Sequence, residues 1–541
     1  MKIDAIFDNG RIRTLDPSRP QATTIGILDG KIVGFDEELH GVTADRMVDL
    51  GGAPVLPGFH DAHFHGTLTG SRLAALDVRP AEAPTLDALY AAVRAFSEGL
   101  PADAIVKASG YDQNITGAHP TAEGLDAASG GRAVVVDHVS GHMTVISTAM
   151  FALAGYPGRV GVPDIAGGHV ERDADGRAVG LLQENAQELY RELTAKESVA
   201  EARRNLGLTS EQAVRYGLTS VTEPGGYNPV VTYLDAVEQG IFQPRITVMP
   251  FVERLHEIDL FRGAGDWLGF DQGFRTGFGD DRVKLGPVKI VSDGSLIGRS
   301  ASMHHCYHGE PENSGFMRFE RDELIEKVGA AHRAGWTVAT HAIGDAAIDH
   351  ALDAIELAHQ ATPRGPVRHR IEHFAVASDE QIARAAALGV IAVPQGRFIS
   401  DFGDGMAAAL GPERAEHCYR MKSLLDAGMV LPGSTDSPIS DGNPILSMHD
   451  MVNRRTASGA VLAPAERISI AEAVRAYTHG SSYAVGEETR KGTLARGCLA
   501  DFVVLSDDLL ATADEAIRDV TVGATVIGGS IVYNQAGLAQ R

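Results

Sequence analysis

Two histidines close an apolar run near the start of the chain. The segment Leu56-Pro57-Gly58-Phe59-His60-Asp61-Ala62-His63-Phe64-His65 places His63 and His65 two residues apart. On a β-strand, residues i and i+2 point to the same face, so both imidazoles could bind one metal ion. His60 has the opposite parity and should pack against the protein. Because the chain has 21 histidines, a chance pair is common, and the hypothesis depends on further ligands.

Three further candidate ligands stand where later apolar runs end. They are His341 after Val338-Ala339-Thr340, His373 after Arg370-Ile371-Glu372, and Asp436 after Gly433-Ser434-Thr435. Several nitrogen and oxygen ligands with an open position are typical of catalytic zinc, which lowers the pKa of bound water toward ~7. Each single histidine could instead be a hydrogen-bonded core residue. Asp436, which precedes Ser437-Pro438, could instead cap a helix.

Lys289 lies inside the apolar run Val288–Val291. An unpaired ammonium is costly to bury, and desolvation favours the neutral amine. A neutral amine can react with CO₂ to give a carbamate, whose two oxygens could bridge two metal ions. Alternatively, the stem of the side chain packs in the protein, and the ammonium pairs with Asp293 or with a substrate carboxylate. The residues alone leave both interpretations open.

The same residues suggest catalytic roles. Asp436 could hold the metal while passing a proton from the attacking water to a leaving nitrogen, and His341 could polarise a carbonyl. Tyr111 and His142, both between residues 66 and 210, are candidate substrate-binding residues, as is Arg397. Arg397 could neutralise a substrate anion or form a surface ion pair, and His142 could equally be a satisfied surface histidine.

Eight strand-like segments, most of them followed by a helical pattern, could position these residues. They cover residues 55–65, 219–222, 245–250, 283–292, 337–341, 369–373, 390–395 and 429–434. Strands that alternate with helices favour parallel βα units, and eight of them predict an α/β fold with a (β/α)₈ TIM-type barrel. Active sites in that fold form at the C-terminal ends of the strands. Helix starts with capping boxes are predicted at Ser198-x-x-Glu201, Ser378-x-x-Gln381 and Ser469-x-x-Glu472.

Both chain ends alternate short β-type runs with turns. Asn9-Gly10 and Asp29-Gly30 separate such runs and predict hairpins. We expect three parts: residues 1–56 with 490–541 as one composite β-sandwich, residues 57–65 with 211–489 as the metal-dependent barrel, and residues 66–210 as an α/β insertion after strand one, over the barrel mouth.

The composition excludes several classes of function. A formal net charge of −23 and a sequence pI near 5.3 argue against nucleic-acid and anionic-membrane partners, which require basic surfaces. The three cysteines, Cys306, Cys418 and Cys498, are far apart and predict no disulfide framework. No apolar run approaches the ~20 residues of a membrane span. We expect a cytoplasmic protein that acts on a small molecule, with a homodimer as the base-rate expectation.

Together, the motifs resemble those of the amidohydrolase superfamily, specifically its YtcJ-like branch (amidohydrolase family 3), which includes N-substituted formamide deformylases. The resemblance covers nearly the whole chain and rests on Pro57–His65, Val288–Leu296, Thr340–Asp345, Arg370–His373, Gly433–Pro438 and Gly492–Asp501. It implies a metal-dependent hydrolase with a composite β-sandwich and favours a carbamylated Lys289. The family pattern usually reads Gly-Ser-Leu-Gly-Ser-Arg where this chain has Gly294-Ser295-Leu296-Ile297-Gly298-Arg299, so no specific substrate is carried over.

We therefore expect hydrolysis of a carbon–nitrogen bond other than a peptide bond, in an amide, N-formyl or cyclic amide. The expected mechanism uses a metal-activated hydroxide, one or two Zn²⁺ or other divalent ions, and Asp436 as proton shuttle. One alternative is hydrolysis of an ester, lactone or carbamate by the same site. The other is a non-catalytic barrel that binds a ligand, which predicts an incomplete set of metal ligands.

Overall fold

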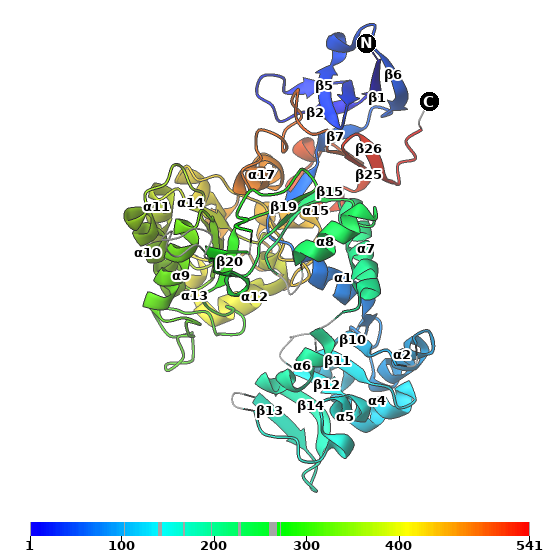
Figure 1. Ribbon diagram of the computed structural model, residues 1–541, viewed down its shortest axis with the longest axis vertical. Helices are drawn as coiled ribbons and strands as arrows, with labels where there is room; N and C mark the ends of the chain where they lie inside the picture. Colours follow the sequence, from blue (N-terminus) through cyan, green and yellow to red (C-terminus); the bar gives the residue numbers. More distant parts are fainter. Residues whose placement is uncertain are drawn as a thin grey trace. The chain divides into compact units, whose positions relative to one another are not determined.

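The computed structural model describes residues 2–101, 103–138, 143–165, 168–195, 197–225, 229–258, 268–270 and 272–539. The chain forms two compact units, one of Met1–Gly66 with Thr209–Arg541 and one of Thr67–Leu208 (Figure 1). All six candidate metal ligands lie in the first unit. Among the described helices, none combines the length and the apolar character needed to cross a bilayer.

Parallel strands form the centre of the first unit. One sheet has the order β19-β16-β15-β8 and another the order β20-β21-β22-β23, and all neighbouring pairs are parallel. The strands are β8 (Phe59–Asp61), β15 (Leu218–Glu223), β16 (Arg245–Val248), β19 (Val283–Leu285), β20 (Val288–Val291), β21 (Val338–Ala342), β22 (Arg370–His373) and β23 (Ile391–Val393). Only Gly286 and Pro287 separate β19 from β20, so one stretch of chain passes from the first sheet into the second. This order is that of a TIM-barrel-type fold.

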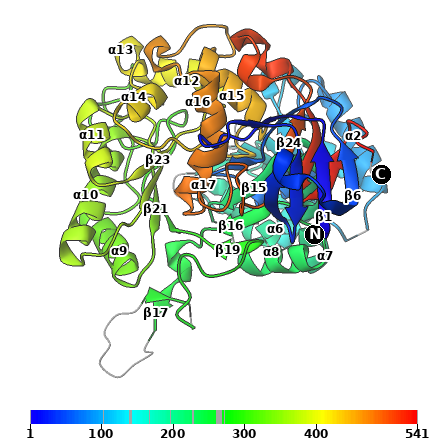
Figure 2. The same cartoon turned by 90° about the horizontal axis from the view of Figure 1, so that it is seen from above.

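Helices follow most of these strands. They are α7 (Val199–Arg215), α8 (Pro229–Glu238), α9 (Arg321–Arg333), α10 (Asp345–Ala361), α11 (Asp379–Ala387), α12 (Phe398–Leu410), α13 (Pro412–Ala415), α14 (Met421–Asp426), α15 (Pro444–Asn453), α16 (Ile470–Arg475) and α17 (Ser481–Ala484). Figure 2 shows α9, α10 and α11 on the outer side of β21 and β23. In α10, Ile348, Leu352 and Ile355 recur at helical spacing and are buried, so one apolar face packs inward.

The eighth predicted strand, over residues 429–434, is wrong as a strand. This segment is irregular, although it does reach β8: Ala62 N donates to Gly433 O (2.9 Å) and Asp436 N donates to His63 O (2.8 Å). Pro432 has no N–H to give to a ladder, and the N–H of Gly433 donates to Ala476 O (3.0 Å) instead. A closed eight-stranded barrel therefore stays a prediction.

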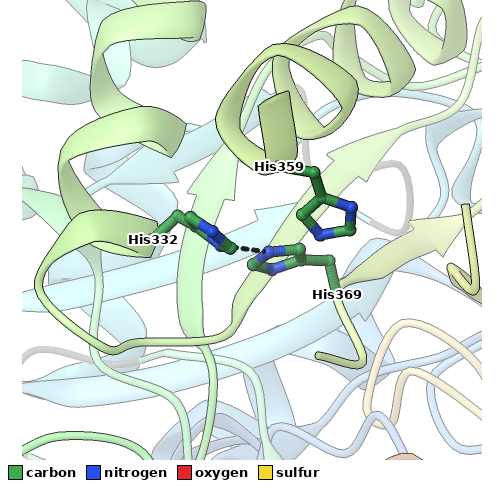
Figure 3. Close-up of side chains that lie close together, drawn as sticks. All are labelled: His332, His359 and His369. Atoms are coloured by element: carbon green, nitrogen blue, oxygen red, sulfur yellow. Dashed lines mark hydrogen bonds between the residues drawn. The ribbon is translucent and has the colours of Figure 1, made fainter. Parts of the chain in front are cut away.

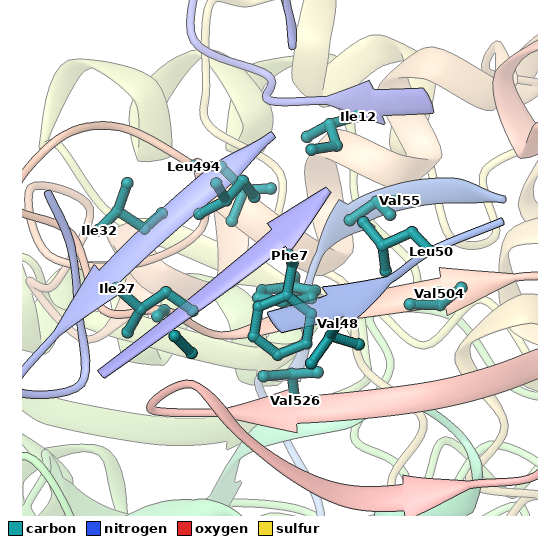
Figure 4. Close-up of a cluster of buried hydrophobic side chains, with 14 of the residues drawn as sticks. Phe7, Ile12, Ile27, Ile32, Val48, Leu50, Val55, Leu494, Val504 and Val526 are labelled. Atoms are coloured by element: carbon teal, nitrogen blue, oxygen red, sulfur yellow. The ribbon is translucent and has the colours of Figure 1, made fainter. Parts of the chain in front are cut away.

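Two further sheets in the first unit are built from the chain ends, one from N-terminal strands alone and one from strands of both ends. Their orders are β5-β4-β1-β6 and β26-β25-β24-β7-β2-β3. The strands are β1 (Lys2–Asp8), β2 (Arg11–Arg13), β3 (Gln21–Ala22), β4 (Ile25–Leu28), β5 (Lys31–Phe35), β6 (Thr43–Asp49), β7 (Pro54–Pro57), β24 (Phe502–Leu505), β25 (Val522–Ile527) and β26 (Ser530–Asn534). One apolar cluster joins them (Figure 4), in which Phe7 meets Phe502 edge-on at 5.0 Å between ring centroids. Burial of this shared apolar surface holds the two ends together.

The two hairpin predictions have different outcomes. Asp29-Gly30 is confirmed: it joins β4 to the antiparallel β5, and both residues have the positive φ of a type I′ turn, 50° and 71°. Asn9-Gly10 is wrong, because β1 and β2 belong to different sheets. The N–H of Gly10 donates to Thr23 O (2.9 Å) rather than back across a hairpin. The turn therefore carries the chain from one sheet to the other.

All three predicted capping boxes are confirmed. Ser378 and Ser469 cap α11 and α16, and Gln381 and Glu472 reach back to the capping residues. Before α7, Ser198 Oγ accepts from Glu201 N (3.2 Å), and the Glu201 carboxylate accepts from Ser198 N (2.8 Å). Reciprocal bonds of this kind satisfy backbone donors that a helix start leaves open.

The second unit is an α/β segment with its own sheet, in the order β13-β14-β12-β11-β10-β9. The strands are β9 (Leu76–Asp77), β10 (Val106–Tyr111), β11 (Val134–His138), β12 (Met143–Ile146), β13 (Gly168–Arg172) and β14 (Ala178–Glu184), and the helices are α1 (Gly66–Ala74), which leads in, α2 (Leu86–Glu98), α3 (Gln113–Thr116), α4 (Ala122–Ser129), α5 (Thr148–Leu153) and α6 (Glu188–Ala195). Its position over the barrel mouth stays a prediction.

Candidate metal centre

Side chains from three distant segments converge in the first unit. His63 follows β8, His373 ends β22, and Asp436 lies in the irregular segment that replaces strand eight. One ligand atom from each lies within 4.8 Å of the others, and all three residues are buried. The Nε2 atoms of His63 and His65 lie 3.3 Å and 3.1 Å from Oδ1 of Asp436. The two histidines of the opening motif thus face one carboxylate oxygen.

A single cavity of about 270 Å³ brings all six candidate ligands together. Its lining includes His63, His65, Lys289, His341, His373 and Asp436. His373 ends β22, His341 is the penultimate residue of β21, and His63 follows the end of β8 by two residues, so these three stand near the C-terminal ends of parallel strands. The cavity therefore collects residues that are more than 370 positions apart in the sequence.

The orientation of His63 is set by a buried carboxylate. His63 Nδ1 lies 2.5 Å from Glu372 Oε2, and Glu372 accepts two bonds from Arg370, at 2.8 Å and 2.9 Å. Burial alone would raise the pKa of Glu372, but Arg370 and then His63 hold it well below its usual range. Since an ionised carboxylate can only accept, Nδ1 of His63 carries the proton. Nε2, which faces Asp436, is then the ring nitrogen that could bind a metal ion.

Two other histidines are held in the same way. His373 Nδ1 donates to the amide oxygen of Gln395 (2.7 Å), and the Gln395 amide nitrogen donates to Val393 O and to Ser434 Oγ. Burial lowers the pKa of His373 well below its usual value, so the ring is neutral. His341 Nε2 donates to Gly294 O (3.1 Å) and lies 3.3 Å from Asp293 Oδ1, so Nδ1 is the ring nitrogen that could bind a metal ion. Each imidazole therefore keeps one nitrogen available as a ligand.

Asp436 completes a donor set that fits a divalent cation. Oδ1 is buried and has no hydrogen bond to any part of the chain that the structure describes, although two imidazole nitrogens lie close to it. Burial alone would raise the pKa of Asp436, but His63 and His65 hold it well below its usual value. The helix-cap alternative is wrong, because the next helix begins at Pro444 and is capped by Asn443. Imidazole nitrogens and an ionised carboxylate oxygen are the ligands that Zn²⁺ prefers in open sites.

Lys289 is buried on β20, where burial lowers the pKa of its ammonium to about 8. The structure describes both Lys289 and Asp293, and no ion pair joins them. The Asp293 carboxylate instead accepts from the backbone N–H groups of Ile343, Gly344 and Ser302, at 2.9–3.1 Å. One of the two alternative partners of the ammonium is thereby excluded, and the neutral amine becomes accessible near neutral pH.

The sequence prediction missed the residues that hold the ligands. Glu372, Gln395 and Asp61 are buried, and Asp61 joins two ligand segments by accepting from His63 N (3.0 Å) and Thr435 Oγ1 (2.5 Å). Burial raises the pKa of Asp61 to about 7. Glu223, on β15, lies 3.6 Å from His65 Nδ1. Glu372 and Asp61 stand one and two residues from predicted ligands, which is the only sequence signal for them.

Of the three predicted substrate-binding residues, Arg397 is the one that the structure describes in the same unit as the candidate metal ligands. Arg397 pairs with Asp450 (2.7 Å) and Asp401 (3.1 Å) and does not line the cavity, in agreement with its ion-pair alternative. Tyr111 belongs to the second unit, where its buried hydroxyl bonds His119 Nδ1 (3.0 Å). His142 lies outside the described residues.

A second histidine cluster has a different character (Figure 3). Ligand atoms of His332, His359 and His369 also lie within 4.8 Å of one another. Val338 N donates to His369 Nδ1 (3.0 Å), so the proton of that ring is on Nε2, which donates to His332 Nδ1 (2.9 Å). His332 Nε2 in turn donates to Thr362 O (2.8 Å). Metal binding at His369 Nε2 would break this chain, so the cluster is a hydrogen-bond relay.

Comparison with known proteins gives consistent matches. Residues 46–533 match the family model described as "Amidohydrolase family". YtcJ of Bacillus subtilis (strain 168) is 27% identical over 98% of this chain and 100% of its own length. The N-substituted formamide deformylase of Arthrobacter pascens is 26% identical over 99% of both chains. The crystal structure of an uncharacterized metal-dependent hydrolase from Pyrococcus horikoshii OT3 matches with a TM-score of 0.78, at 26% identity, over 94% of this chain and 99% of that one.

Proposed function

The chain belongs to the amidohydrolase family of metal-dependent hydrolases, and on that premise we propose that it cleaves a carbon–nitrogen bond of an amide, N-formyl or cyclic amide small molecule. The observation that carries this proposal is the convergence of four imidazoles, one lysine and one aspartate in a single cavity. A relative of similar length is named for the removal of formyl groups from N-substituted formamides, which supports a C–N bond as the target.

We propose that the six residues of the cavity hold one or two divalent metal ions, with zinc as the first candidate. A bound ion of this kind acidifies water and polarises a carbonyl group. Glu372 and Gln395 keep His63 and His373 in the tautomers that a ligand requires. Asp436 is the only carboxylate among the described lining residues, so it accepts the proton of the attacking water and delivers it to the leaving nitrogen.

We also propose that Lys289 is carbamylated. In that reaction the neutral amine attacks CO₂, one C–N bond forms, and one proton is released, which leaves a carboxylate-like group with two oxygen ligands. The lowered pKa of Lys289 and its place in the lining of the same cavity as His341 support this step. We propose that His341 binds a metal ion held by the carbamate and helps to polarise the substrate carbonyl.

Hydrolysis of an ester, lactone or carbamate is the alternative. A leaving nitrogen must be protonated, and Asp436 is the only described lining residue that we assign to this step. The lining therefore gives no further reason to prefer a leaving nitrogen over a leaving oxygen. A side-by-side assay of a matched amide and ester on metal-loaded protein separates the two. We expect turnover of the amide and its loss in Asp436→Asn, while turnover of the ester alone refutes the amide assignment. Bound metal with no turnover of any carbonyl compound would favour a ligand-binding barrel.

Several coarser features complete the proposal. We propose that the protein is a homodimer, that it acts on a small molecule, and that it is located in the cytoplasm. The three cysteines are free, which suits the reducing environment of that compartment. We also propose that the parallel strands close into a barrel through the irregular segment of residues 429–434, that residues 1–56 and 490–541 form one composite sandwich, and that residues 66–210 cover the barrel mouth. The bonds from Ala62 and Asp436 across the strand-eight segment support closure.

A further inference from the structure

A second cavity lies at the N-terminal ends of three of the parallel strands. Its volume is about 360 Å³, which is within the usual range of small-molecule sites. Pro287, Thr337 and Arg368 line it and precede β20, β21 and β22 by one or two residues. The candidate ligands His341 and His373 stand at or near the other ends of β21 and β22. The described linings of the two cavities share no residue, so a ligand here would bind apart from the metal centre.

Arg364 brings a positive charge to this second cavity. Its Nη1 donates to His332 O and Trp336 O (both 2.8 Å), and its Nη2 donates to Gly335 O (2.9 Å). These neutral carbonyls fix the guanidinium in place without cancelling its charge, and no described carboxylate forms an ion pair with it. Five N–H groups minus three bonds leave the Nε–H and one Nη2–H for a ligand. Nε and Nη2 share one edge of the guanidinium, so both can bind oxygens of one anion.

Arg275 places a second positive charge beside the first. Gly335 has a φ of 92°, and a Cβ at this residue would lie 2.6 Å from Arg275 Nη1. The Arg275 guanidinium therefore packs directly on Gly335, whose carbonyl also holds Arg364. Burial is the largest cause that lowers the pKa of Arg364, and the charge of Arg275 lowers it further. Within the described ranges, Arg275 has no carboxylate partner either.

The other ionisable groups of the lining neutralise each other. Arg368 donates two hydrogen bonds to the carboxylate of Glu488, at 2.7 Å and 3.0 Å, and its guanidinium lies over the Tyr483 ring, 3.6 Å from the centroid. With two arginines and one glutamate, the described lining carries one net positive charge, although the whole chain has a formal net charge of −23. A concave cationic surface on an acidic protein favours an anionic ligand.

From this arrangement we infer that the second cavity binds the phosphate group of a small molecule. A phosphate monoester is a dianion above about pH 7, which matches the charges of Arg364 and Arg275, and its oxygens can accept both remaining N–H groups of Arg364. The cavity corresponds to roughly twelve waters at ~30 Å³ each, so it has room for a phosphate and one small organic group. This site is independent of the reaction proposed above.

Calorimetry with phenyl phosphate on metal-loaded protein tests the site. We expect binding to weaken on the order of tenfold in Arg364→Gln and in Arg275→Gln, because each variant removes a charged partner of the phosphate. Arg275 is exposed and donates no hydrogen bond to a described residue, so Arg275→Gln carries little risk to folding. Arg496→Gln, at an exposed position outside the lining, is the matched control and should bind as the wild type does.

The variants also separate this site from the metal centre, where a phosphate could bind a metal ion. Unchanged affinity in both Arg364→Gln and Arg275→Gln would place the ligand elsewhere and overturn the inference, as would equal weakening in the Arg496→Gln control. Benzoate has the same ring with one charge fewer, and we expect it to bind the wild type at least tenfold more weakly. Benzoate binding as tight as that of phenyl phosphate would refute a phosphate site.

Discussion

Glu372 decides which nitrogen of His63 faces the cavity. Its carboxylate is fully buried between His63 and Arg370, so it positions the ligand without touching the substrate. This arrangement explains how a short motif of two histidines becomes a preformed ligand pair. The proposed metal centre thus includes the six lining residues together with the buried polar groups behind them.

The first prediction concerns Glu372→Gln. We expect metal affinity to fall about 10–100-fold, because the ligand orientation and basicity of His63 depend on the carboxylate. Stability should fall by about 3–5 kcal/mol, because Arg370 is left as an uncompensated buried charge. Chelator competition and thermal unfolding measure the two effects.

The matched control is Glu488→Gln, which breaks the partly exposed pair with Arg368. Exposed pairs contribute about 0–1 kcal/mol, so stability should change little and metal affinity not at all. Unchanged metal affinity in Glu372→Gln would refute the positioning role.

At this scale, the sequence predicted the residues that line the cavity but not their hydrogen-bond partners. His63, His65, His341, His373, Asp436 and Lys289 share a cavity, and all but Lys289 were predicted from their positions at the ends of strand-like runs. The partners depend on contacts between segments far apart in sequence. Glu372 was missed because strand alternation places it opposite His373, and only the fold shows that this side faces His63.

At the scale of elements, the relay of His332, His359 and His369 joins α9, α10 and the start of β22. Burial is the largest cause that lowers the pKa of all three rings, most strongly that of His369, and the hydrogen bond to Thr362 partly offsets it at His332. Each ring stays neutral in the folded chain but gains a proton near ~6.5 when unfolded. Stability is therefore fully present above that pH and falls as the pH drops below it.

The second prediction follows from this loss of stability at low pH. His359 Nε2 is buried with no hydrogen-bond partner among the described residues, so His359→Phe removes one ring that must stay neutral without breaking the relay. We expect the free energy of unfolding of this variant to fall less than that of the wild type between about pH 7.5 and about pH 5, by an amount on the order of 1 kcal/mol.

Differential scanning calorimetry at several pH values measures this difference. His417→Phe, at an exposed position, is the control and should follow the wild type. Equal acid sensitivity of His359→Phe and the wild type would show that the relay does not titrate on unfolding.

Sequence reasoning found most elements but failed where backbone donors were diverted. The stretch from Met429 to Ser434 has the apolar character of a strand, yet Pro432 and the bond from Gly433 to Ala476 prevent a ladder. Asn9-Gly10 has ideal hairpin residues, but the strands on either side pair with other partners. Local residue preferences fix the turn, whereas strand pairing depends on the whole sheet.

At the scale of the molecule, a buried ion pair joins the parallel strands to the terminal sheets. Arg245 on β16 forms a two-bond contact with Asp501, at 2.6 Å and 2.9 Å, and the two side chains are 8% and 4% exposed. Burial alone would lower the pKa of Arg245, but Asp501 raises it. The pair lies next to β24, where the chain returns to the terminal sheets.

The third prediction is that Asp501→Asn destabilises the protein by about 3–5 kcal/mol, since Arg245 keeps its charge without a partner. Thermal unfolding of the first unit measures it. Asp45→Asn breaks an ion pair with Lys2 in which both side chains are more than half exposed, and should cost less than ~1 kcal/mol. Equal effects of the two substitutions would refute a structural role for the Arg245–Asp501 pair.

The sequence predicted the family and the order of the parallel strands, but it could not establish where residues 66–210 lie. The family resemblance is confirmed, because the family model spans residues 46–533. The TIM-barrel-type order of parallel strands follows from regular alternation of strands and helices, which is a local signal. The placement of residues 66–210 is not a local signal, since it depends on the interface of that unit with the rest of the chain.

The central claim is that the six cavity residues hold the catalytic metal. Its most direct test is metal content per chain by elemental mass spectrometry, on protein expressed with bicarbonate, beside His63→Ala, Lys289→Ala and the exposed control His417→Ala. We predict one or two divalent ions per chain in the wild type and the control, and loss of metal in His63→Ala. Two ions that fall to one or none in Lys289→Ala would support the bridging carbamate, and one ion in both would reduce Lys289 to a structural or substrate-binding role. Hydrolysis by a metal-free chain, or undiminished metal in His63→Ala, would contradict the account.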